Sequence, residues 1–242
     1  MKMVVLFTDF GSSGPYLGQM EAVLRQSAPQ LSVINLVSNA PRSPRISSYL
    51  LAALRYSLPE QSVFVAVVDP GVGGPRLPLV LYADGQWFVG PDNDLLNTVA
   101  KQSIDIKWWI ITWRPESCST SFHGRDIFAP IAAMIVTDRL TNELSSFTGP
   151  DLTDWLTDIN EIIYFDDYGN AFTGLRYSET FRGRYVITEA GQRLPPADTF
   201  CSVAKGAGFW YRNSNDLVEI AINQGSVVEQ FKVKLGDLFT ME

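Results

Sequence analysis

The chain has 242 residues, of which 46% are hydrophobic and 19% are charged, so it can bury enough apolar surface to form a folded core. It carries 19 Lys plus Arg against 26 Asp plus Glu, a formal net charge of −7, which argues against a nucleic-acid partner. Its longest apolar runs, such as Val63–Val68 and Ile131–Val136, are far shorter than the roughly 20 residues that cross a bilayer, so no membrane partner is expected.

Two cysteines and one histidine limit the available chemistry. Cys118 and Cys201 are far apart, which excludes a local zinc ribbon or CxxC redox pair. His123 is the single histidine, so multi-histidine metal clusters are excluded unless carboxylates supply the ligands. We therefore expect a reaction without a metal. The N-terminal segment lacks the apolar stretch of a signal peptide, so a cytoplasmic protein is expected.

Strands and helices are predicted to alternate in the first half of the chain, which is typical of a largely parallel sheet. Ser43 is placed to cap a helix that begins with Pro44. Asp84-Gly85 predicts a hairpin between two strands. The expected strands are Met3–Thr8, Leu31–Val37, Val63–Val68, Leu77–Tyr82, Trp87–Val89 and Lys107–Thr112, and the expected helices are Leu17–Gln26, Pro44–Ser57 and Arg125–Thr137.

After Gly149-Pro150 the pattern changes to short strands separated by turns. The expected strands are Glu161–Phe165, Arg184–Thr188, Leu217–Asn223 and Phe231–Val233, which indicate a small barrel or sandwich. We therefore expect an α/β fold with a mostly parallel N-terminal sheet and a smaller, β-barrel-like C-terminal domain. The expected boundaries are 1–150 for the N-terminal α/β domain, 151–160 for a linker and 161–242 for the β domain.

Polar residues follow the predicted strands, where open α/β sheets hold their ligands. Asp9 follows the first strand, and Asp69 follows the run Val63–Val68. Three glycines and two prolines separate Asp69 from Arg76, so the chain can turn back sharply there. We expect Asp69 and Arg76 to form an ion pair that keeps the carboxylate ionised. The alternative is that Asp69 only caps the turn and Arg76 is solvated.

Two further turns carry candidate site residues. His123 lies before Gly124 and an apolar helical segment, where its imidazole could exchange a proton near neutral pH, although a lone histidine can also be structural. Asp166 and Asn170 enclose a short polar segment at a predicted strand end. That segment fits a tight hairpin turn and a ligand site equally well.

Several segments of the chain, taken together and in order, resemble those of the S-adenosyl-L-methionine (SAM) hydroxide adenosyltransferases. These proteins are SAM hydrolases related to nucleophilic fluorinases and chlorinases. The resemblance covers nearly the whole chain. The matching segments are Thr8-Asp9-Phe10-Gly11 with Tyr16-Leu17-Gly18, Val68-Asp69-Pro70-Gly71-Val72-Gly73 with Arg76, Pro91-Asp92-Asn93, Phe122-His123-Gly124-Arg125-Asp126-Ile127-Phe128-Ala129-Pro130, Asp166 through Asn170, and Asn213-Ser214 with Glu219-Ile220-Ala221-Ile222-Asn223.

The resemblance implies hydrolysis of SAM to adenosine and L-methionine by attack of an activated water on C5′, with no cofactor. It assigns water activation to Asp69, Arg76 and His123. The implied substrate-binding residues are Asp9 for the ribose hydroxyls, Asp166 for the methionine ammonium, Tyr168 for stacking near the adenine, Asn170 for reading the adenine, Ser214 and Asn215 for the methionine carboxylate, and Asn93. It also implies a homotrimer that holds the substrate between the N-terminal domain of one subunit and the C-terminal domain of the next.

Four positions depart from the residues usual in this family. Gly14 stands where the family usually has an acidic residue, and Asp94 stands where it has a glycine. Gly174 stands where it often has an asparagine, and Asn215 stands where it has an arginine-like residue beside Ser214. These departures leave open a protein that binds SAM or adenosine without catalysis, because function depends on the site rather than on the fold. A SAM-dependent halogenase is a further alternative, although those relatives depart at the histidine segment that is complete here.

Overall fold

The computed structural model describes residues 2–242. The chain divides into two compact units, one formed by the residues up to Ala52 with Leu58–Trp155 and the other by Ala53–Ser57 with Leu156–Glu242. Each unit contains its own apolar core. No helix in the described part of the chain is long and apolar enough to cross a membrane.

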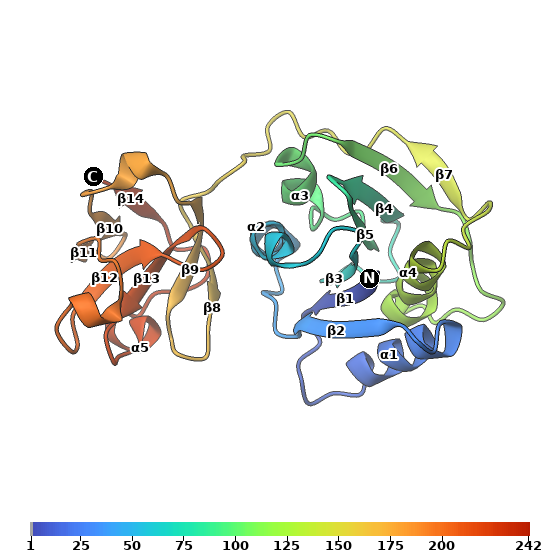
Figure 1. Cartoon of the computed structure of the whole chain (residues 1–242), viewed down its shortest axis with the longest axis horizontal. Coiled ribbons are helices and arrows are strands. Elements are labelled where there is room, and N and C mark those ends of the chain that lie inside the picture. Colours follow the sequence, from blue (N-terminus) through green and yellow to red (C-terminus); the bar gives the residue numbers. More distant parts are fainter. Residues whose placement is uncertain (1) are drawn as a thin grey trace. The chain divides into compact units, whose positions relative to one another are not determined.

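The first unit is built on a seven-stranded sheet with the order β2-β1-β3-β5-β4-β6-β7 (Figure 1). Strands β2, β1, β3 and β5 pair in parallel, whereas β4, β6 and β7 join through antiparallel pairings. Because β6 runs in the direction of β5, only β4 and β7 oppose the rest, which confirms a mostly parallel sheet. The strands are β1 (Met3–Thr8), β2 (Ser32–Val37), β3 (Val63–Val67), β4 (Pro78–Ala83), β5 (Gln86–Pro91), β6 (Ile106–Ile111) and β7 (Leu144–Phe147).

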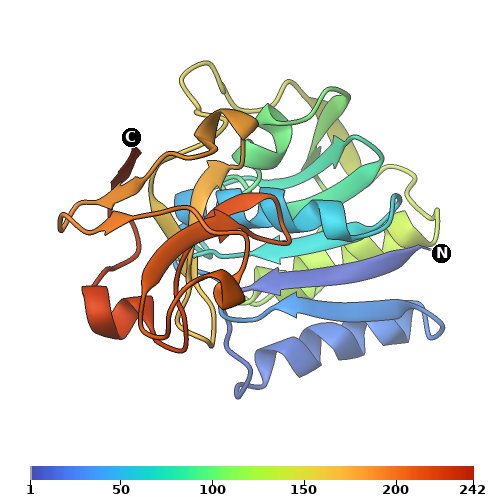
Figure 2. The same cartoon turned by 60° about the vertical axis from the view of Figure 1, so that its left-hand side comes forward.

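Helices cover both faces of this sheet. Figures 1 and 2 show α1 (Tyr16–Ser27) and α4 (Ala129–Val136) on one face and α2 (Pro44–Leu54) and α3 (Asn97–Lys101) on the other. In β3, Val65 packs into the core shared with α1 and α4, while Phe64 points the other way and stacks on Phe88, with ring centroids 4.7 Å apart. Burial on both faces explains why β3 is apolar throughout, since alternate side chains of a strand point to opposite faces.

All predicted strands and helices of the first unit are present, with small shifts at their ends. Asp84 and Gly85 have positive φ values of 46° and 89°, as a two-residue hairpin requires. The Ser43 hydroxyl accepts a hydrogen bond from the Ile46 amide at 3.4 Å near the start of α2. The predicted helix at Arg125–Thr137 instead begins with a π-helical turn, η2 (Gly124–Phe128), before α4. The elements α3 and β7 lie outside the predicted ones.

The second unit contains two antiparallel sheets, which confirms the smaller β domain. The first sheet has the order β12-β13-β9-β8 and the second the order β11-β10-β14, and among residues 2–242 they do not close into a barrel. The strands are β8 (Ile162–Phe165), β9 (Ala171–Arg176), β10 (Val186–Thr188), β11 (Arg193–Leu194), β12 (Gly208–Arg212), β13 (Leu217–Ile222) and β14 (Phe239–Met241). Short helical segments are α5 (Val227–Phe231), η1 (Arg55–Ser57), η3 (Glu179–Phe181) and η4 (Phe200–Ser202).

The predicted strand at Phe231–Val233 is wrong. Phe231 is the last residue of α5, and Lys232 takes a left-handed φ of 58° that ends the helix. Ser226 begins this helix, because its hydroxyl accepts a hydrogen bond from the Glu229 amide at 3.2 Å. Phe231 and Val233 both pack on the core of the second unit, so their alternation reflects a helix end and the following turn. Strands β9, β11, β12 and β14 were not predicted.

Candidate active site

The ion pair predicted between Asp69 and Arg76 is present. Asp69 follows β3, and Arg76 Nε donates to both of its carboxylate oxygens at 2.8 Å, while Arg76 Nη2 donates to Oδ2. The side chains are only 4% and 9% exposed, so Arg76 is not solvated. The turn between them needs Gly73, whose φ is +80° and where an added Cβ would lie 2.5 Å from the Thr120 carbonyl oxygen. The glycine-rich segment therefore makes the pair possible.

Arg76 also contacts His123, 47 residues further along the chain. The distance from Arg76 Nη2 to His123 Nδ1 is 3.0 Å. A guanidinium can only donate, so Nδ1 accepts and the neutral ring carries its proton on Nε2. Burial lowers the pKa of His123, and the positive charge of Arg76 lowers it further, whereas Asp69 opposes the shift. His123 is therefore neutral around pH 7.

A cavity of about 400 Å³ in the first unit lies at the carboxyl ends of β1 and β3. Asp9, Asp69 and His123 are among the residues that line it. Burial raises the pKa of Asp9, and the nearby charge of Asp69 acts in the same direction. This edge of the sheet is where an open α/β fold is expected to hold its ligand.

Three aromatic rings form one wall of this cavity. Phe10, Tyr16 and Phe122 contact one another with ring centroids 5.3 to 5.8 Å apart. No role for these rings follows from the sequence, although all three lie inside the motif segments around Asp9 and His123. The wall makes part of the cavity apolar, which strengthens electrostatic interactions within it.

The turn that carries His123 is held by a second ion pair. Arg125 Nε donates to Asp126 Oδ1 at 2.6 Å, and Asp126 Oδ2 accepts from the Ser119 amide at 2.8 Å. Arg125 Nη1 also donates to Gln19 of α1 at 3.0 Å. These contacts tie the segment before His123 to the π-helical turn after it, and such turns are frequent at functional sites.

Asn93 lies close to the site without lining the cavity. Its side-chain amide donates to the Val68 carbonyl oxygen at 2.9 Å, directly before Asp69. The next residue, Asp94, has a φ of 79°, a left-handed conformation that favours glycine. Asp94 also accepts a hydrogen bond from the Asn97 side chain at 3.1 Å. The backbone thus keeps a conformation that suits the glycine that the resemblance leads us to expect here.

The second unit holds a separate cavity of about 800 Å³, lined by Asp166, Tyr168, Asn170 and Ser214 among others. Asp166 Oδ1 accepts from the Tyr168 amide at 3.0 Å and from the Asn170 amide at 2.8 Å. Asp166 Oδ2 accepts from the Asn170 side chain at 3.0 Å. The segment is therefore a hydrogen-bonded hairpin turn between β8 and β9, and its side chains also face a cavity.

Two departures noted in the sequence have a structural setting in this unit. An added Cβ at Gly174 would lie 2.3 Å from Ile159 Cγ1, so the usual asparagine has no room. Asn215 is not among the residues that line the 800 Å³ cavity, and its amide donates to Asn213 Oδ1 at 2.9 Å. The lining does include Tyr211, Asn213 and Glu219, for which the sequence indicates no role.

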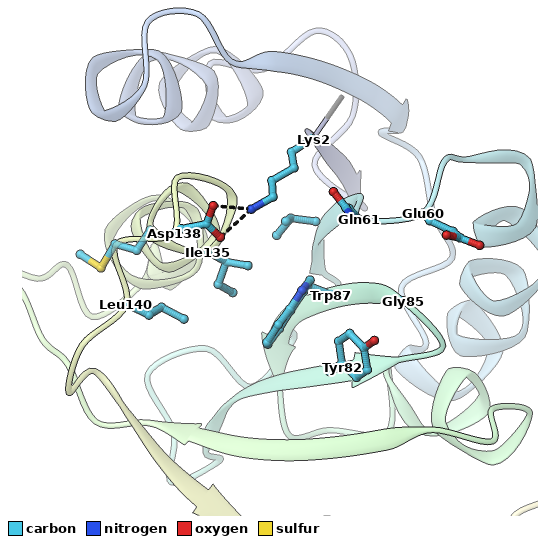
Figure 3. Close-up of a pocket in the computed structure, with 11 residues that line it drawn as sticks. Lys2, Glu60, Gln61, Tyr82, Gly85, Trp87, Ile135, Asp138 and Leu140 are labelled. Carbon is cyan, nitrogen blue, oxygen red and sulfur yellow. Dashed lines mark hydrogen bonds and ion pairs between the residues drawn. The ribbon is translucent and has the colours of Figure 1, made fainter.

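Another cavity of the first unit, of about 610 Å³, lies where β3 and β5 begin, at the opposite ends of these strands from Asp69 (Figure 3). Its charged groups include Lys2 and Asp138, whose Nζ and Oδ1 atoms are 2.5 Å apart. The two charges neutralise each other, and Figure 3 shows them above Ile135 and Trp87. Across residues 2–242 there is no group of three or more His, Cys, Asp or Glu side chains that could hold a metal ion.

The fold and the site define a class: an α/β protein with a carboxylate, a guanidinium and an imidazole in contact at the carboxyl edge of a mostly parallel sheet. The chain matches the SAM hydroxide adenosyltransferase N-terminal domain over residues 4–145 and the C-terminal domain of the same family over residues 160–240. The protein belongs to the SAM hydroxide adenosyltransferase family.

Curated relatives and solved structures agree with this family. The chain is 35% identical to the (R)-S-adenosyl-L-methionine hydrolase of Thermus thermophilus, with 98% of each chain covered. It is 30% identical to the enzyme of that name from Salinispora arenicola, over 95% of this chain and 94% of the relative. It also superposes on the crystal structure of a conserved protein from Thermotoga maritima with a TM-score of 0.86, 28% identity and 99% of each chain covered.

Proposed function

We propose that this protein hydrolyses SAM to adenosine and L-methionine by attack of water or hydroxide on C5′. The observation that carries the proposal is the direct contact of Arg76 with both Asp69 and His123 beside a cavity at the ligand-binding edge of the sheet. Family membership and the (R)-S-adenosyl-L-methionine hydrolases among its relatives support SAM as the substrate.

The proposed reaction is an in-line displacement. The water oxygen forms a bond to C5′ while the bond from C5′ to the sulfonium breaks, and its electron pair stays on sulfur. Methionine leaves as a neutral thioether, so the leaving group needs no general acid. The demand falls on the nucleophile, because water must be oriented and must lose a proton. We propose that no metal or organic cofactor takes part.

Each of the three contacting residues has a distinct proposed role. Arg76 stabilises the developing hydroxide, and Asp69 holds the guanidinium through three hydrogen bonds. His123 receives the proton of the water. Since Nδ1 accepts from Arg76 in this structure, proton uptake there requires Arg76 to transfer its hydrogen bond from His123 to the nucleophile.

The remaining residues are proposed to bind substrate or, for Asn93, to support the binding site. In the first unit, Asp9 binds the ribose hydroxyls, and Asn93 supports the site through the Val68 carbonyl. In the second unit, Asp166 is proposed to contact the methionine ammonium group, and Tyr168 and Asn170 are proposed to contact the adenine. Ser214 and its neighbour Asn215 are proposed to bind the methionine carboxylate. The position of four of these side chains on one 800 Å³ cavity supports this assignment.

We further propose a homotrimer in which the N-terminal domain of one subunit and the C-terminal domain of the next share each substrate. The support is that acid–base groups line the cavity of one unit, while the candidate methionine and adenine contacts line a separate cavity of the other. We propose that residues 1–150 and 161–242 form the two functional domains and that residues 151–160 form the linker between them. Composition and cysteine usage favour the cytoplasm as the place of action.

The proposed function is tested by incubating the purified protein with each sulfonium epimer of SAM in ¹⁸O-labelled water. Attack on C5′ places the label in the 5′-hydroxyl of adenosine, and the names of the relatives favour the (R) epimer. His123→Ala should lower turnover by about 10²-fold or more, the usual effect of losing an acid–base group. Unlabelled adenosine would refute attack on C5′. In a parallel reaction with added halide, formation of 5′-halogenated adenosine would favour the halogenase. Tight binding without product would favour a binding protein.

The shared site is tested by subunit complementation. His123→Ala disables the first unit and Asp166→Ala the second, so each variant alone should be nearly inactive. Co-expression should restore part of the activity, because mixed trimers contain sites with neither substitution. A monomeric mass in solution, or mixed oligomers without activity, would refute the shared site.

A further inference from the structure

A buried polar network in the second unit has no role in the mechanism described so far. Glu219, on β13, is 2% exposed and faces Tyr211 directly across the pairing of β12 with β13. The Tyr211 hydroxyl donates to Glu219 Oε1 at 2.6 Å, and the Asn213 side-chain amide donates to Oε2 at 2.8 Å. Both carboxylate oxygens are therefore satisfied inside the protein.

The Asn213 side chain connects Glu219 to the turn that carries Ser214. Its Oδ1 atom accepts from the Asn215 amide at 2.9 Å and from the Leu217 amide at 3.0 Å. The backbone N–H of Asn213 donates to the Leu217 carbonyl oxygen at 2.9 Å. The buried Asn213 side chain thus holds the Asn213–Leu217 turn together with the backbone hydrogen bonds of that turn.

Glu219 and the turn together fix the orientation of the Asn213 side chain. An ionised carboxylate only accepts hydrogen bonds, so the amide nitrogen of Asn213 must face it and the amide oxygen must face the turn. Burial raises the pKa of Glu219, and the hydrogen bonds from Tyr211 and Asn213 offset only part of that rise. Without Glu219, the buried amide nitrogen of Asn213 would lose this acceptor, and the side chain would be held only through its oxygen.

We propose that Glu219 is a positioning residue for substrate binding: through Asn213 it holds the turn in the conformation that presents Ser214 to the carboxylate of SAM. Ser214, Asn213 and Glu219 line the same cavity as Asp166, which the proposed function assigns to the methionine ammonium. The inference rests on that proposed function, and it adds the element that shapes the carboxylate site.

The test compares SAM with an analogue of SAM that lacks the methionine carboxylate. Glu219→Leu and Asn213→Ala should each raise KM for SAM by about tenfold or more, the usual effect of losing a hydrogen bond to a charged group. Turnover at saturation should stay near that of the parent, because Ser214 contributes to binding rather than to the chemical step. With the analogue, KM should be the same in parent and variants, because the contact in question is absent.

Conservative and matched variants separate positioning from folding. Glu219→Gln should keep KM near the parent value, because a glutamine oxygen can accept from Asn213 while its nitrogen donates to Tyr211. Thr173→Val is the control, since it removes another buried hydrogen bond of this unit, from Thr173 Oγ1 to the Val218 carbonyl at 2.6 Å. It should leave KM for SAM unchanged.

Several outcomes would overturn the inference. Equal losses for SAM and the analogue would show that Glu219 does not act on the carboxylate site, and so would an unchanged KM in Glu219→Leu. If that variant does not fold, Asn213→Ala decides by the same comparison. A parent protein that hydrolyses neither compound would instead refute the proposed function.

Discussion

Asp69→Asn should destabilise the first unit, because it removes the negative charge from an ion pair whose side chains are 4% and 9% exposed. Neutralising one partner of a buried pair costs about 3–5 kcal/mol, since the other charge stays buried without compensation. In a protein of this size, 1 kcal/mol corresponds to about 2–4 °C, so the midpoint of thermal unfolding should fall by about 6–20 °C. Calorimetry or circular dichroism would measure this loss.

Glu21→Gln provides the matched control, as the same carboxylate-to-amide change in the same unit. Glu21 pairs with Arg25 on α1, and these side chains are 45% and 49% exposed. An exposed helical pair contributes about 0.5 kcal/mol or less, so the control should unfold within about 2 °C of the parent. An Asp69→Asn protein that unfolds as late as the control would refute the buried-pair argument.

The same pair should set the pH dependence of any residual activity. Burial and Arg76 lower the pKa of His123, whereas Asp69 raises it. Asp69→Asn should therefore move the acidic limb of kcat/KM to lower pH, and Arg76→Met should move it to higher pH. Shifts in the same direction in both variants would show that another group controls the limb.

Three further predictions concern His123 and two glycines. In the parent, kcat/KM should fall as the pH is lowered, with a midpoint below pH 6.5, because the lowered pKa of His123 keeps its ring neutral down to that midpoint. A midpoint above pH 6.5 would contradict this. Gly73→Ala should lower the free energy of unfolding by about 1 kcal/mol or more and should reduce turnover. The control is Gly71→Ala, because the space around the Cβ position of Gly71 is open; thermal unfolding and turnover of this variant should match those of the parent. Gly174→Asn should destabilise the second unit by about 1–3 kcal/mol, and a denaturant midpoint equal to that of the parent would refute the lack of room.

Local patterns in the chain were sufficient for most of the first unit. The apolar run at β3 identified a strand covered on both faces, and Asp84-Gly85 identified the hairpin, because burial and turn geometry act within a few neighbouring residues. The same patterns failed at Phe231–Val233, where three residues fit either a strand or a helix end. They also missed β9 and β12, although β9 pairs with the preceding strand β8 and β12 pairs with the following strand β13.

The chemical identity of the candidate site was readable in the chain: an Asp after a buried strand, an Arg beyond a flexible turn, and one histidine. The contact between Arg76 and His123 could not be predicted from the chain. These two residues meet only because β5 lies between β3 and β4 in the sheet and the segment before η2 folds back. Glu219 shows the same division, since a carboxylate in an apolar strand becomes meaningful only once Tyr211 and Asn213 are placed against it. Periodicity acts over a few residues, whereas these contacts depend on how long segments close on one another.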